Sequence, residues 1–410
     1  MLVDEVESFT EDTQGAIRGL TRLQKVYNLD TDRLTDGWVG GTQAHSILTA
    51  ADCVEVAQFL SQRHEFVLAT SWLRTALSRV DSEGDTTMSQ QDVASQLYVY
   101  SMLAMCEQDG FAPLLSQSLL SHDIFYSPNA ATAKLYLLAL DESCSWYDPA
   151  LKLDEVDMTE DEHHSFNKMC RGEPKGPRGL KCHYVHYHQP SLLLAPFKLE
   201  EVVISPPIVL VHQVISDTEI QELKEASLSK LSGCETVYNV ITSKASTYRT
   251  CDKGWVEDSD APVAARLTRR VGQLANLGMT FSEQHQVACY GLGGEYKLHR
   301  DPLESMDLSE TNPAGQRIAT VMFYLNHVAR GGYTVFPLLK VAVAPVKGSA
   351  VFWFNILHDS SEDHRTLHGG CPVLLGAKWV LNKWIREGGQ KLQGHHCPRD
   401  EHFPKEYFYV

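Results

Sequence analysis

Two residues whose types could bind a metal, His299 and Asp301, close the segment YGLGGEYKLHRD. On a β-strand, residues two apart project to the same face, so this imidazole and this carboxylate could reach one metal ion from a rigid support. The motif is short, and with 18 histidines and 52 acidic residues in the chain, about two such matches would arise by chance. The pair therefore predicts a metal site only if a further ligand lies elsewhere in the chain.

A further ligand is available downstream at His368. Two imidazoles and one carboxylate leave three positions of an octahedral metal open, as in non-haem iron(II) oxygenases. Lys378 follows His368 by ten residues, along what reads as two short strands around a glycine turn. A dicarboxylate cosubstrate would chelate the iron with its keto-acid end and would need a buried cation, here Lys378, for its other carboxylate. The alternative reading of these residues is a surface histidine and a solvated lysine.

The elements that must position these residues lie in the second half of the chain. From Val202 onward, short β-rich runs alternate with glycine, proline and asparagine turns. The expected strands are Pro207–Val214, Gln286–Leu292, Arg317–Leu325, Val341–Pro345 and Ser349–Asn355, and the expected helices are Ser216–Leu231, which opens with a capping box, and Pro262–Leu277. This pattern predicts a double-stranded β-helix, or jelly roll, with helices flanking one face.

The first half of the chain has a helical pattern, with apolar residues at three- and four-residue spacing. The expected helices are Ala50–Leu60, Phe66–Val80, Val93–Met105, Phe111–Leu120 and Ala130–Leu140. Adjacent helical hairpins of this size resemble a tetratricopeptide-type stack, and a simple helical bundle is the alternative. From Asp148 to Pro196 the periodicity fades into an acidic run and a Gly/Pro-rich stretch, which predicts a linker. The fold class is thus α+β with several domains.

Charge and composition exclude several classes of function. A formal charge of −16 argues against a nucleic-acid backbone or an anionic membrane surface as the main partner. No apolar run approaches the roughly 20 residues that span a bilayer, and the N-terminus has no pattern of a secretory signal. Among the ten cysteines, Cys170 with Cys182 and Cys371 with Cys397 are close enough in sequence to close loops, although each could also be an unconnected thiol.

From about Val202 to Cys397 the sequence resembles the catalytic domain of the collagen prolyl 4-hydroxylase α-subunit family. The resemblance lies in VACYGLGGEYKLHRD, RIATVMFYLN, GGYTVFP, KGSAVFWFN and HGGCPVLLGAKWVLNKWI, in this order. Upstream, the Cys170–Cys182 segment resembles that family's disulfide loop. GLTRLQKVYNLDTDRL and LTAADCVEVAQFL resemble the entry to its helical peptide-binding domain.

The resemblance implies a role for each of several residues. The implied iron ligands are His299, Asp301 and His368. The C5 carboxylate of 2-oxoglutarate would be bound by Lys378 together with the hydroxyls of Tyr290 and Thr334. The peptide-proline pocket would be lined by Tyr296, Arg317 and Trp384. The residues alone leave other roles open, because Tyr296 and Trp384 could be core aromatics and Arg317 a charge at a strand edge. The resemblance also implies the disulfides Cys170–Cys182 and Cys371–Cys397.

The same resemblance implies an activity and its surroundings. The expected reaction is hydroxylation at C4 of peptidyl proline in collagen-like X-Pro-Gly sequences, coupled to decarboxylation of 2-oxoglutarate to succinate and CO2. Its cofactors would be Fe(II), 2-oxoglutarate, O2 and L-ascorbate. The expected partners are a proline-rich or collagen-like peptide and protein disulfide isomerase as a β subunit, in an α2β2 tetramer in the lumen of the endoplasmic reticulum.

The resemblance also implies a division of the chain into four parts. These are a remnant of an N-terminal dimerisation segment (1–41), a helical peptide-substrate-binding domain (42–145), a linker with a disulfide loop (146–200) and the oxygenase domain (201–410). On this reading the chain begins near the end of the dimerisation segment, without a signal peptide. Tyr98, Tyr100 and Tyr136 are candidate peptide-groove residues, with ordinary core packing as their alternative.

Three rival functions remain open from the sequence. One is a catalytically inactive subunit or chaperone that binds peptides. Another is a cupin-type metal enzyme that does not bind 2-oxoglutarate. The last is a 2-oxoglutarate oxygenase that acts on a proline-rich protein other than collagen.

Overall fold

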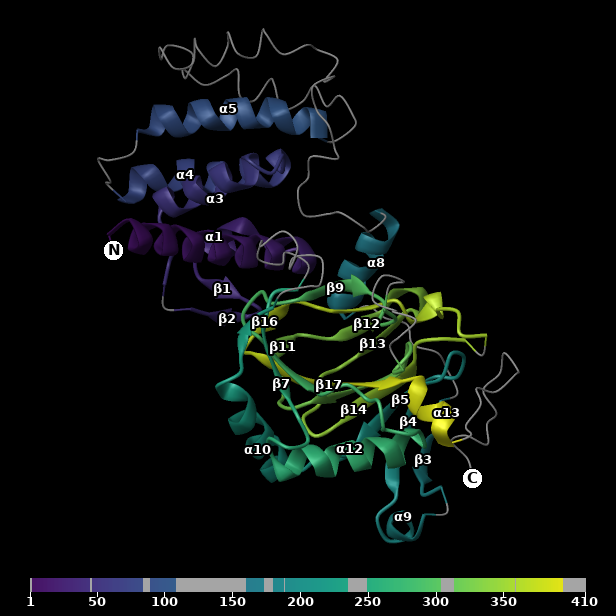
Figure 1. Cartoon of the computed structure of the whole chain (residues 1–410). Coiled ribbons are helices and arrows are strands. Elements are labelled where there is room, and N and C mark those ends of the chain that lie inside the picture. Colours follow the sequence, from purple (N-terminus) through teal and green to yellow (C-terminus); the bar gives the residue numbers. More distant parts are fainter. Residues whose placement is uncertain are drawn as a thin grey trace. The chain divides into compact units, whose positions relative to one another are not determined.

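A computed structural model of the chain describes residues 2–44, 46–83, 89–107, 160–172, 180–187, 189–234, 249–303, 313–357 and 359–393 (Figure 1). The chain divides into two compact units, Met1–Asp157 and Met158–Val410. The expected helices Phe111–Leu120 and Ala130–Leu140, and with them Tyr136, lie outside the described residues, as does Cys397. No helix in the described part of the chain is long and apolar enough to cross a bilayer.

The first unit is built from helices that follow one another in the chain. Its elements are α1 (Leu2–Tyr27), α2 (Thr31–Thr35), β1 (Trp38–Val39), β2 (Thr42–Gln43), α3 (Ala50–Ser61), α4 (Phe66–Glu83) and α5 (Gln90–Glu107). A capping box between Thr49 and Asp52 fixes the start of α3. The expected helices Ala50–Leu60, Phe66–Val80 and Val93–Met105 are therefore confirmed within a few residues, and their apolar faces share one core around Trp72.

The second unit contains most of the strands. Its helices are α8 (Glu160–Cys170), α9 (Pro190–Leu194), α10 (Asp217–Leu228), α12 (Pro262–Ala275) and α13 (Gly388–Gln393), with 3₁₀ turns η4 (Pro337–Leu339) and η5 (His364–Thr366). Its strands are β3 (Cys182–Val185), β4 (Phe197–Val203), β5 (Ile208–His212), β6 (Ser232–Gly233), β7 (Asp252–Val256), β8 (His285–Tyr290), β9 (Tyr296–His299), β10 (Arg317–Tyr324), β11 (Arg330–Gly331), β12 (Thr334–Phe336), β13 (Val341–Val343), β14 (Ala350–Phe354), β15 (His368–Gly370), β16 (Val373–Leu375) and β17 (Lys378–Arg386).

These strands form two main sheets. The larger has nine strands in the order β3-β4-β5-β14-β10-β17-β8-β7-β6, and the smaller has four in the order β13-β12-β15-β9. The pairings within both are antiparallel. Alternate residues of the large sheet take part in two different cores: Val321 packs with α10 and α12, whereas Met322 packs with the small sheet. The two facing sheets, with α10 and α12 on the outer face of the large one, match the predicted jelly-roll arrangement (Figure 1).

The segment expected as a linker contributes structure to the second unit. Within it, α8 packs against β12, β13 and η4, while β3 pairs with β4, which begins where the segment ends, and both extend the large sheet. Glu201 lies in β4 with its side chain buried, and its carboxylate accepts a hydrogen bond of 2.9 Å from the Lys181 backbone N–H. A charged residue at an inward position hides the alternation of the strand, which explains why the sequence did not indicate β4.

The predicted disulfide pairing is wrong. Cys170, at the end of α8, bonds to Cys371, just after β15, across 201 residues of sequence. Cys182 carries a free, exposed thiol. A further disulfide, which the sequence did not indicate, joins Cys234, directly after β6, to Cys251, directly before β7. Closeness in sequence is a poor guide here, because packing of α8 on the small sheet brings distant thiols together.

Candidate active site

Strand pairing brings His299 and His368 together. His299 ends β9, His368 begins β15, and these neighbouring strands align the two residues directly opposite each other. Asp301 lies just beyond β9 rather than on it, so the strand positions only one of the two motif residues as predicted. The Asp301 carboxylate oxygens are 3.8 Å from His299 Nε2 and 3.9 Å from His368 Nε2. All candidate ligand atoms lie within 4.8 Å of one another, a spacing that suits a single metal ion.

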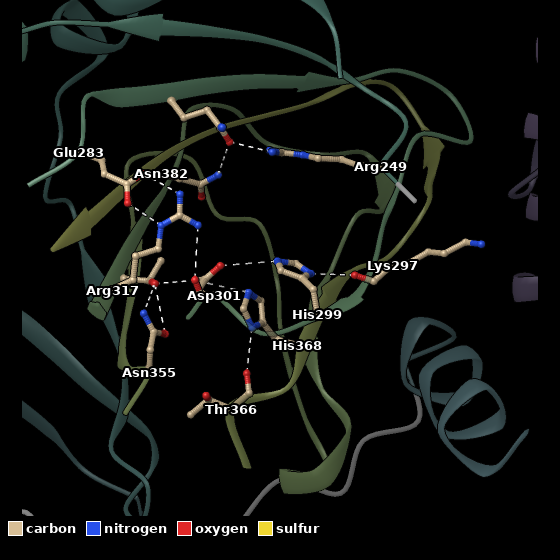
Figure 2. A network of polar contacts seen from close by, with 12 residues as sticks. Arg249, Glu283, Lys297, His299, Asp301, Arg317, Asn355, Thr366, His368 and Asn382 are labelled. Carbon is tan, nitrogen blue, oxygen red and sulfur yellow. Dashed lines mark hydrogen bonds and ion pairs between the residues drawn. The ribbon is translucent and has the colours of Figure 1, made fainter. Parts of the chain in front are cut away.

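Backbone carbonyls fix the orientation of both imidazole rings. Nδ1 of His299 lies 2.8 Å from the Lys297 carbonyl oxygen, and Nδ1 of His368 lies 2.9 Å from the Thr366 carbonyl oxygen (Figure 2). A carbonyl oxygen only accepts, so each Nδ1 carries the proton. Each Nε2 is then unprotonated and lies beside the Asp301 carboxylate, where it can offer its lone pair to a metal ion.

Asp301 is held from β10 and β14. The Thr320 hydroxyl donates to Asp301 Oδ2 at 2.5 Å, and the Asn355 amide donates to the Thr320 hydroxyl at 2.9 Å (Figure 2). Burial alone would raise the pKa of Asp301, but the two imidazoles, Arg317 and the Thr320 hydroxyl together hold this pKa below its usual value. The carboxylate is therefore ionised at neutral pH.

The rings around the two histidines keep water away. Tyr296 stacks on His299 with ring centroids 3.6 Å apart, and Trp353 and Phe336 contact His368 at centroid distances of 4.8 Å and 5.5 Å. Burial, and then the charge of His368, lower the pKa of His299 to about 3. Two imidazole nitrogens and one carboxylate form a donor set that fits Fe(II).

Lys378 enters the same pocket from β17, opposite Tyr290 on β8. Its side chain is 4% exposed, and its ammonium group donates to the Thr334 hydroxyl at 3.4 Å. Among the described residues, no carboxylate forms an ion pair with Lys378. Burial, and then the charge of Arg249, lower its pKa to about 7. A buried cation with no anionic partner suits a ligand carboxylate.

The two hydroxyl groups expected to assist Lys378 are placed differently. Thr334 is in contact with Lys378, and Tyr324 donates to the same Thr334 hydroxyl at 2.9 Å. Tyr290 presents its ring, 6.0 Å from the Lys378 ammonium, while its hydroxyl accepts a hydrogen bond from Arg249. A direct hydrogen bond from Tyr290 to the cosubstrate stays a prediction.

One pocket joins the metal ligands to Lys378. Its empty volume is about 470 Å³ including the open mouth. The predicted site residues that line it are Tyr290, Tyr296, His299, Asp301, Thr334, His368, Lys378 and Trp384. Cys371 also lines it, so the Cys170–Cys371 disulfide lies at the pocket wall.

Arg317 lies beside this lining and is no solvated edge charge. Its guanidinium carbon is 4.0 Å from the Trp384 ring centroid, and its side chain is 19% exposed. Glu283 accepts two hydrogen bonds from Arg317, at 2.5 and 2.6 Å, and another from Arg386 at 2.8 Å. Arg300, the middle residue of the ligand motif, points away from the ligands and pairs with Glu362 at 3.1 Å.

The sequence alone did not indicate several residues of this network. Thr320, Asn355 and Glu283 support the predicted residues from other strands or loops, and Arg249 lies buried against Tyr290 and Tyr296. For Thr320 a signal existed, because its position in β10 alternates in phase with Met322 toward the pocket. No pattern in the sequence marks Arg249 or Glu283.

Comparison with known proteins identifies the family to which the chain is similar. A family model of the 2OG-Fe(II) oxygenase superfamily matches residues 285–386, and a model of the prolyl 4-hydroxylase alpha-subunit N-terminal region matches residues 7–41. Prolyl 4-hydroxylase subunit alpha-2 of Caenorhabditis elegans is 36% identical over 406 residues, which cover 93% of this chain and 72% of that protein. Subunit alpha-1 of Homo sapiens is 34% identical over 405 residues, which cover 93% of this chain and 75% of that protein.

Among solved structures, a viral collagen prolyl hydroxylase from Paramecium Bursaria Chlorella virus-1, in its 2OG complex, is 27% identical. It covers 44% of this chain and 95% of its own, with a TM-score of 0.36, which is too low to support a comparison of folds. The matches to the sequence relatives cover nearly the whole chain, and the oxygenase match includes His299, Asp301, His368 and Lys378. The chain therefore belongs to the prolyl 4-hydroxylase α-subunit family, and its second unit contains an oxygenase domain that uses Fe(II), 2-oxoglutarate and O2.

Proposed function

We propose that this chain hydroxylates C4 of peptidyl proline in collagen-like X-Pro-Gly sequences and converts 2-oxoglutarate to succinate and CO2. The observation that carries the proposal is a single pocket with the His299, Asp301 and His368 donors at one end and, at the other, the Lys378 ammonium group, which forms no ion pair with a carboxylate of the described residues. Neither end alone would distinguish an oxygenase from other metal enzymes. Together they fit a ligand with a chelating keto acid and a distant carboxylate.

Each group of the pocket has a defined task. The bound iron, with 2-oxoglutarate and O2, supplies the oxidising chemistry that an unactivated C–H bond needs and that no side chain can provide. Lys378 binds the C5 carboxylate of 2-oxoglutarate, and the Thr334 hydroxyl orients the Lys378 ammonium. Trp353 and Phe336 exclude water from the ligand side of the pocket.

The peptide would be held by the aromatic side of the pocket. Tyr296 and Trp384 line it, and Arg317 is fixed against Trp384 by its double hydrogen bond to Glu283. These three residues are the proposed contacts that aim one proline hydrogen at the metal. Holding the reacting atoms in line is how such a site selects one C–H bond.

The helical unit is proposed to bind the peptide chain as a tetratricopeptide-like domain. Proline-rich chains are extended polyproline II rods, which aromatic grooves bind with little loss of entropy. Tyr98 and Tyr100 on α5 are partly exposed and are candidate groove residues. Tyr100 also packs near Phe66 and hydrogen-bonds to Ser61 at 2.8 Å, so part of its surface serves the core of the unit.

The surroundings of the enzyme are proposed from its family membership. These are protein disulfide isomerase as β subunit in an α2β2 tetramer, the lumen of the endoplasmic reticulum as location, and L-ascorbate as the reductant of oxidised iron. The disulfides Cys170–Cys371 and Cys234–Cys251 support an oxidising compartment. Co-purification of the chain with the isomerase would test the partner.

The substrate is tested by mass spectrometry of a (Pro-Pro-Gly)-type peptide after incubation with the protein, Fe(II), 2-oxoglutarate and ascorbate. We expect a mass gain of one oxygen, located at proline C4, and none with the Lys378→Ala variant. Succinate production without peptide hydroxylation would favour an oxygenase for another proline-rich protein. Peptide binding with neither product would favour an inactive peptide-binding subunit, and failure to bind 2-oxoglutarate would favour a cupin-type enzyme.

A further inference from the structure

A short stretch of backbone, residues 249–251, is fixed on both sides beside the pocket. On one side, the Cys234–Cys251 disulfide and a 2.8 Å hydrogen bond from the Cys234 N–H to the Cys251 carbonyl attach it to β6. On the other side, the Thr250 N–H donates to the Glu295 carbonyl at 2.9 Å, and Arg249 forms a β-bridge with Tyr296.

The approach of this stretch to β9 is close. A Cβ atom on Gly294 would lie 2.9 Å from the Thr250 carbonyl oxygen, a distance that Cβ atoms do not adopt without a shift of the backbone. Glycine at this position therefore lets the stretch pack directly against the start of β9. The stretch is therefore fixed against Tyr296, which lines the pocket.

The Arg249 side chain points from this stretch into the interior and is 4% exposed. Its Nε donates to the Tyr290 hydroxyl at 3.0 Å, and its Nη1 donates to Gln286 Oε1 at 2.8 Å. Its guanidinium carbon lies 4.4 Å from the centroid of the Tyr296 ring. One side chain thus contacts both tyrosines of the pocket.

The contacts of Arg249 reach both ends of the pocket. Tyr296 stacks on the metal ligand His299, and Tyr290 lies opposite Lys378 in the strand register. A displaced guanidinium would release both rings at once. It would also leave the Tyr290 hydroxyl buried without its donor, which is costly.

We propose that Arg249 is a positioning residue for the oxygenase pocket and that the Cys234–Cys251 disulfide holds it in place. Through Tyr290 and Tyr296, the guanidinium fixes the wall against which 2-oxoglutarate and the metal ligand His299 pack. Breaking the disulfide loosens the stretch that carries Arg249 and weakens cosubstrate binding. The inference rests on the proposed binding of 2-oxoglutarate between the metal and Lys378.

The test is a double-mutant cycle of four proteins: wild type, Arg249→Ala, Cys234→Ser/Cys251→Ser, and the triple variant. The dissociation constant of 2-oxoglutarate is measured under nitrogen in the presence of Fe(II), so that no turnover is needed. We expect Arg249→Ala to weaken binding about tenfold, the size of a lost hydrogen bond from a charged group. We expect the double-serine variant to bind 2-oxoglutarate about threefold more weakly. The triple variant should bind it no more than about tenfold more weakly, because the effects of coupled sites do not add.

A further readout follows the tyrosines directly. The near-ultraviolet circular dichroism of the metal-free protein should change in Arg249→Ala, and to a smaller extent in the double-serine variant. Arg249→Lys keeps the charge but loses the planar fork, so it should fall between wild type and Arg249→Ala in both measurements. This conservative variant also serves if Arg249→Ala does not fold.

Controls come from residues remote from the pocket wall. Cys182→Ser removes an exposed free thiol, and Arg266→Ala removes a guanidinium on α12 that pairs with Glu222. Both should bind 2-oxoglutarate as the wild type does. If the two losses of 2-oxoglutarate affinity multiplied fully in the triple variant, to about thirtyfold, the disulfide would not act through Arg249.

Unchanged binding and an unchanged tyrosine spectrum in Arg249→Ala would overturn the inference altogether. If the wild type itself bound no 2-oxoglutarate, the proposed function would fail instead. The two failures are therefore distinguishable.

Discussion

The metal end of the pocket and the lysine end are held by different kinds of group. At the metal end, backbone carbonyls and the Thr320 hydroxyl orient the proposed ligands His299, His368 and Asp301, so the protein itself sets their geometry. At the other end, the Lys378 ammonium donates to the Thr334 hydroxyl and lies near the Tyr290 and Tyr324 rings, and no carboxylate of the described residues forms an ion pair with it. One end is a preformed cation site, and the other is a buried cation that a ligand must neutralise.

Loss of a metal ligand should have the largest effect and should affect only the first of these ends. In His368→Ala we expect iron affinity to fall by more than about 100-fold. Removal of a residue that only hydrogen-bonds to a metal ligand already lowers metal affinity about 10- to 100-fold. The iron content of purified protein after dialysis measures this. Arg300→Ala, next to two ligands in sequence but paired with Glu362 outside, should keep its iron. Iron retained by His368→Ala would refute the assignment.

Loss of the ammonium group should affect only the lysine end. In Lys378→Ala we expect 2-oxoglutarate to bind at least about 30-fold more weakly, because removal of one partner of a buried charge pair costs about 2 to 5 kcal/mol. Calorimetric titration under nitrogen measures the affinity, and the iron content should be unchanged. The matched control is Lys347→Ala, which removes a surface ammonium paired with Asp217 at 2.8 Å. Equal affinity in Lys378→Ala and wild type would remove the cosubstrate assignment.

A subtler change tests whether the metal end is truly preformed. Thr320→Val removes the hydroxyl that donates to Asp301 while conserving the shape of the side chain. We expect iron affinity to fall about tenfold, as for other contacts that orient a ligand. Competition with a chelator measures it, and Thr320→Ser, which keeps the hydroxyl, should behave almost as the wild type. A full loss of iron would instead mean that Thr320 is needed to fold the site.

The smallest expected effect is a pH dependence confined to the lysine end. Burial and Arg249 lower the pKa of Lys378 to about 7, so above that pH the free protein must take up a proton to bind the C5 carboxylate. The dissociation constant of 2-oxoglutarate should therefore rise about fivefold between pH 7 and pH 8, by proton linkage. Lys378→Arg, which stays charged, should show a flat profile. A fall in the dissociation constant with rising pH would contradict the predicted direction of this pH dependence.

The sequence was a good guide where one local pattern decides the structure. The strands Ile208–His212 and Arg317–Tyr324 and the helix Asp217–Leu228 follow from alternation, apolar runs and a capping box, and each lies within a few residues of its prediction. His299, Asp301, His368 and Lys378 followed from ordered motifs, and the structure brings them into one pocket.

The sequence was a poor guide where contacts between segments far apart in the chain determine the structure. The pairing of Cys170 with Cys371 depends on how α8 packs on the small sheet, which no spacing reveals. Arg249 and Glu283 are charged residues, which the sequence alone would place at the surface. Their hydrogen-bond partners on other strands compensate the free-energy cost of removing these charges from water. Buried polar networks are therefore the part of such a site that a single sequence hides best.

The direct pairing of His299 with His368 also bears on the order of events during folding. The strands that carry them, β9 and β15, are separated in the chain by β10 to β14, so their contact is non-local and forms late. A chain that is still emerging from the ribosome, or one cut between these strands, holds only two of the three ligands. Tight iron uptake must therefore follow closure of the small sheet, and it then stabilises the closed sheet by the free energy of binding. Iron content thus reports whether the C-terminal half of the molecule has been assembled.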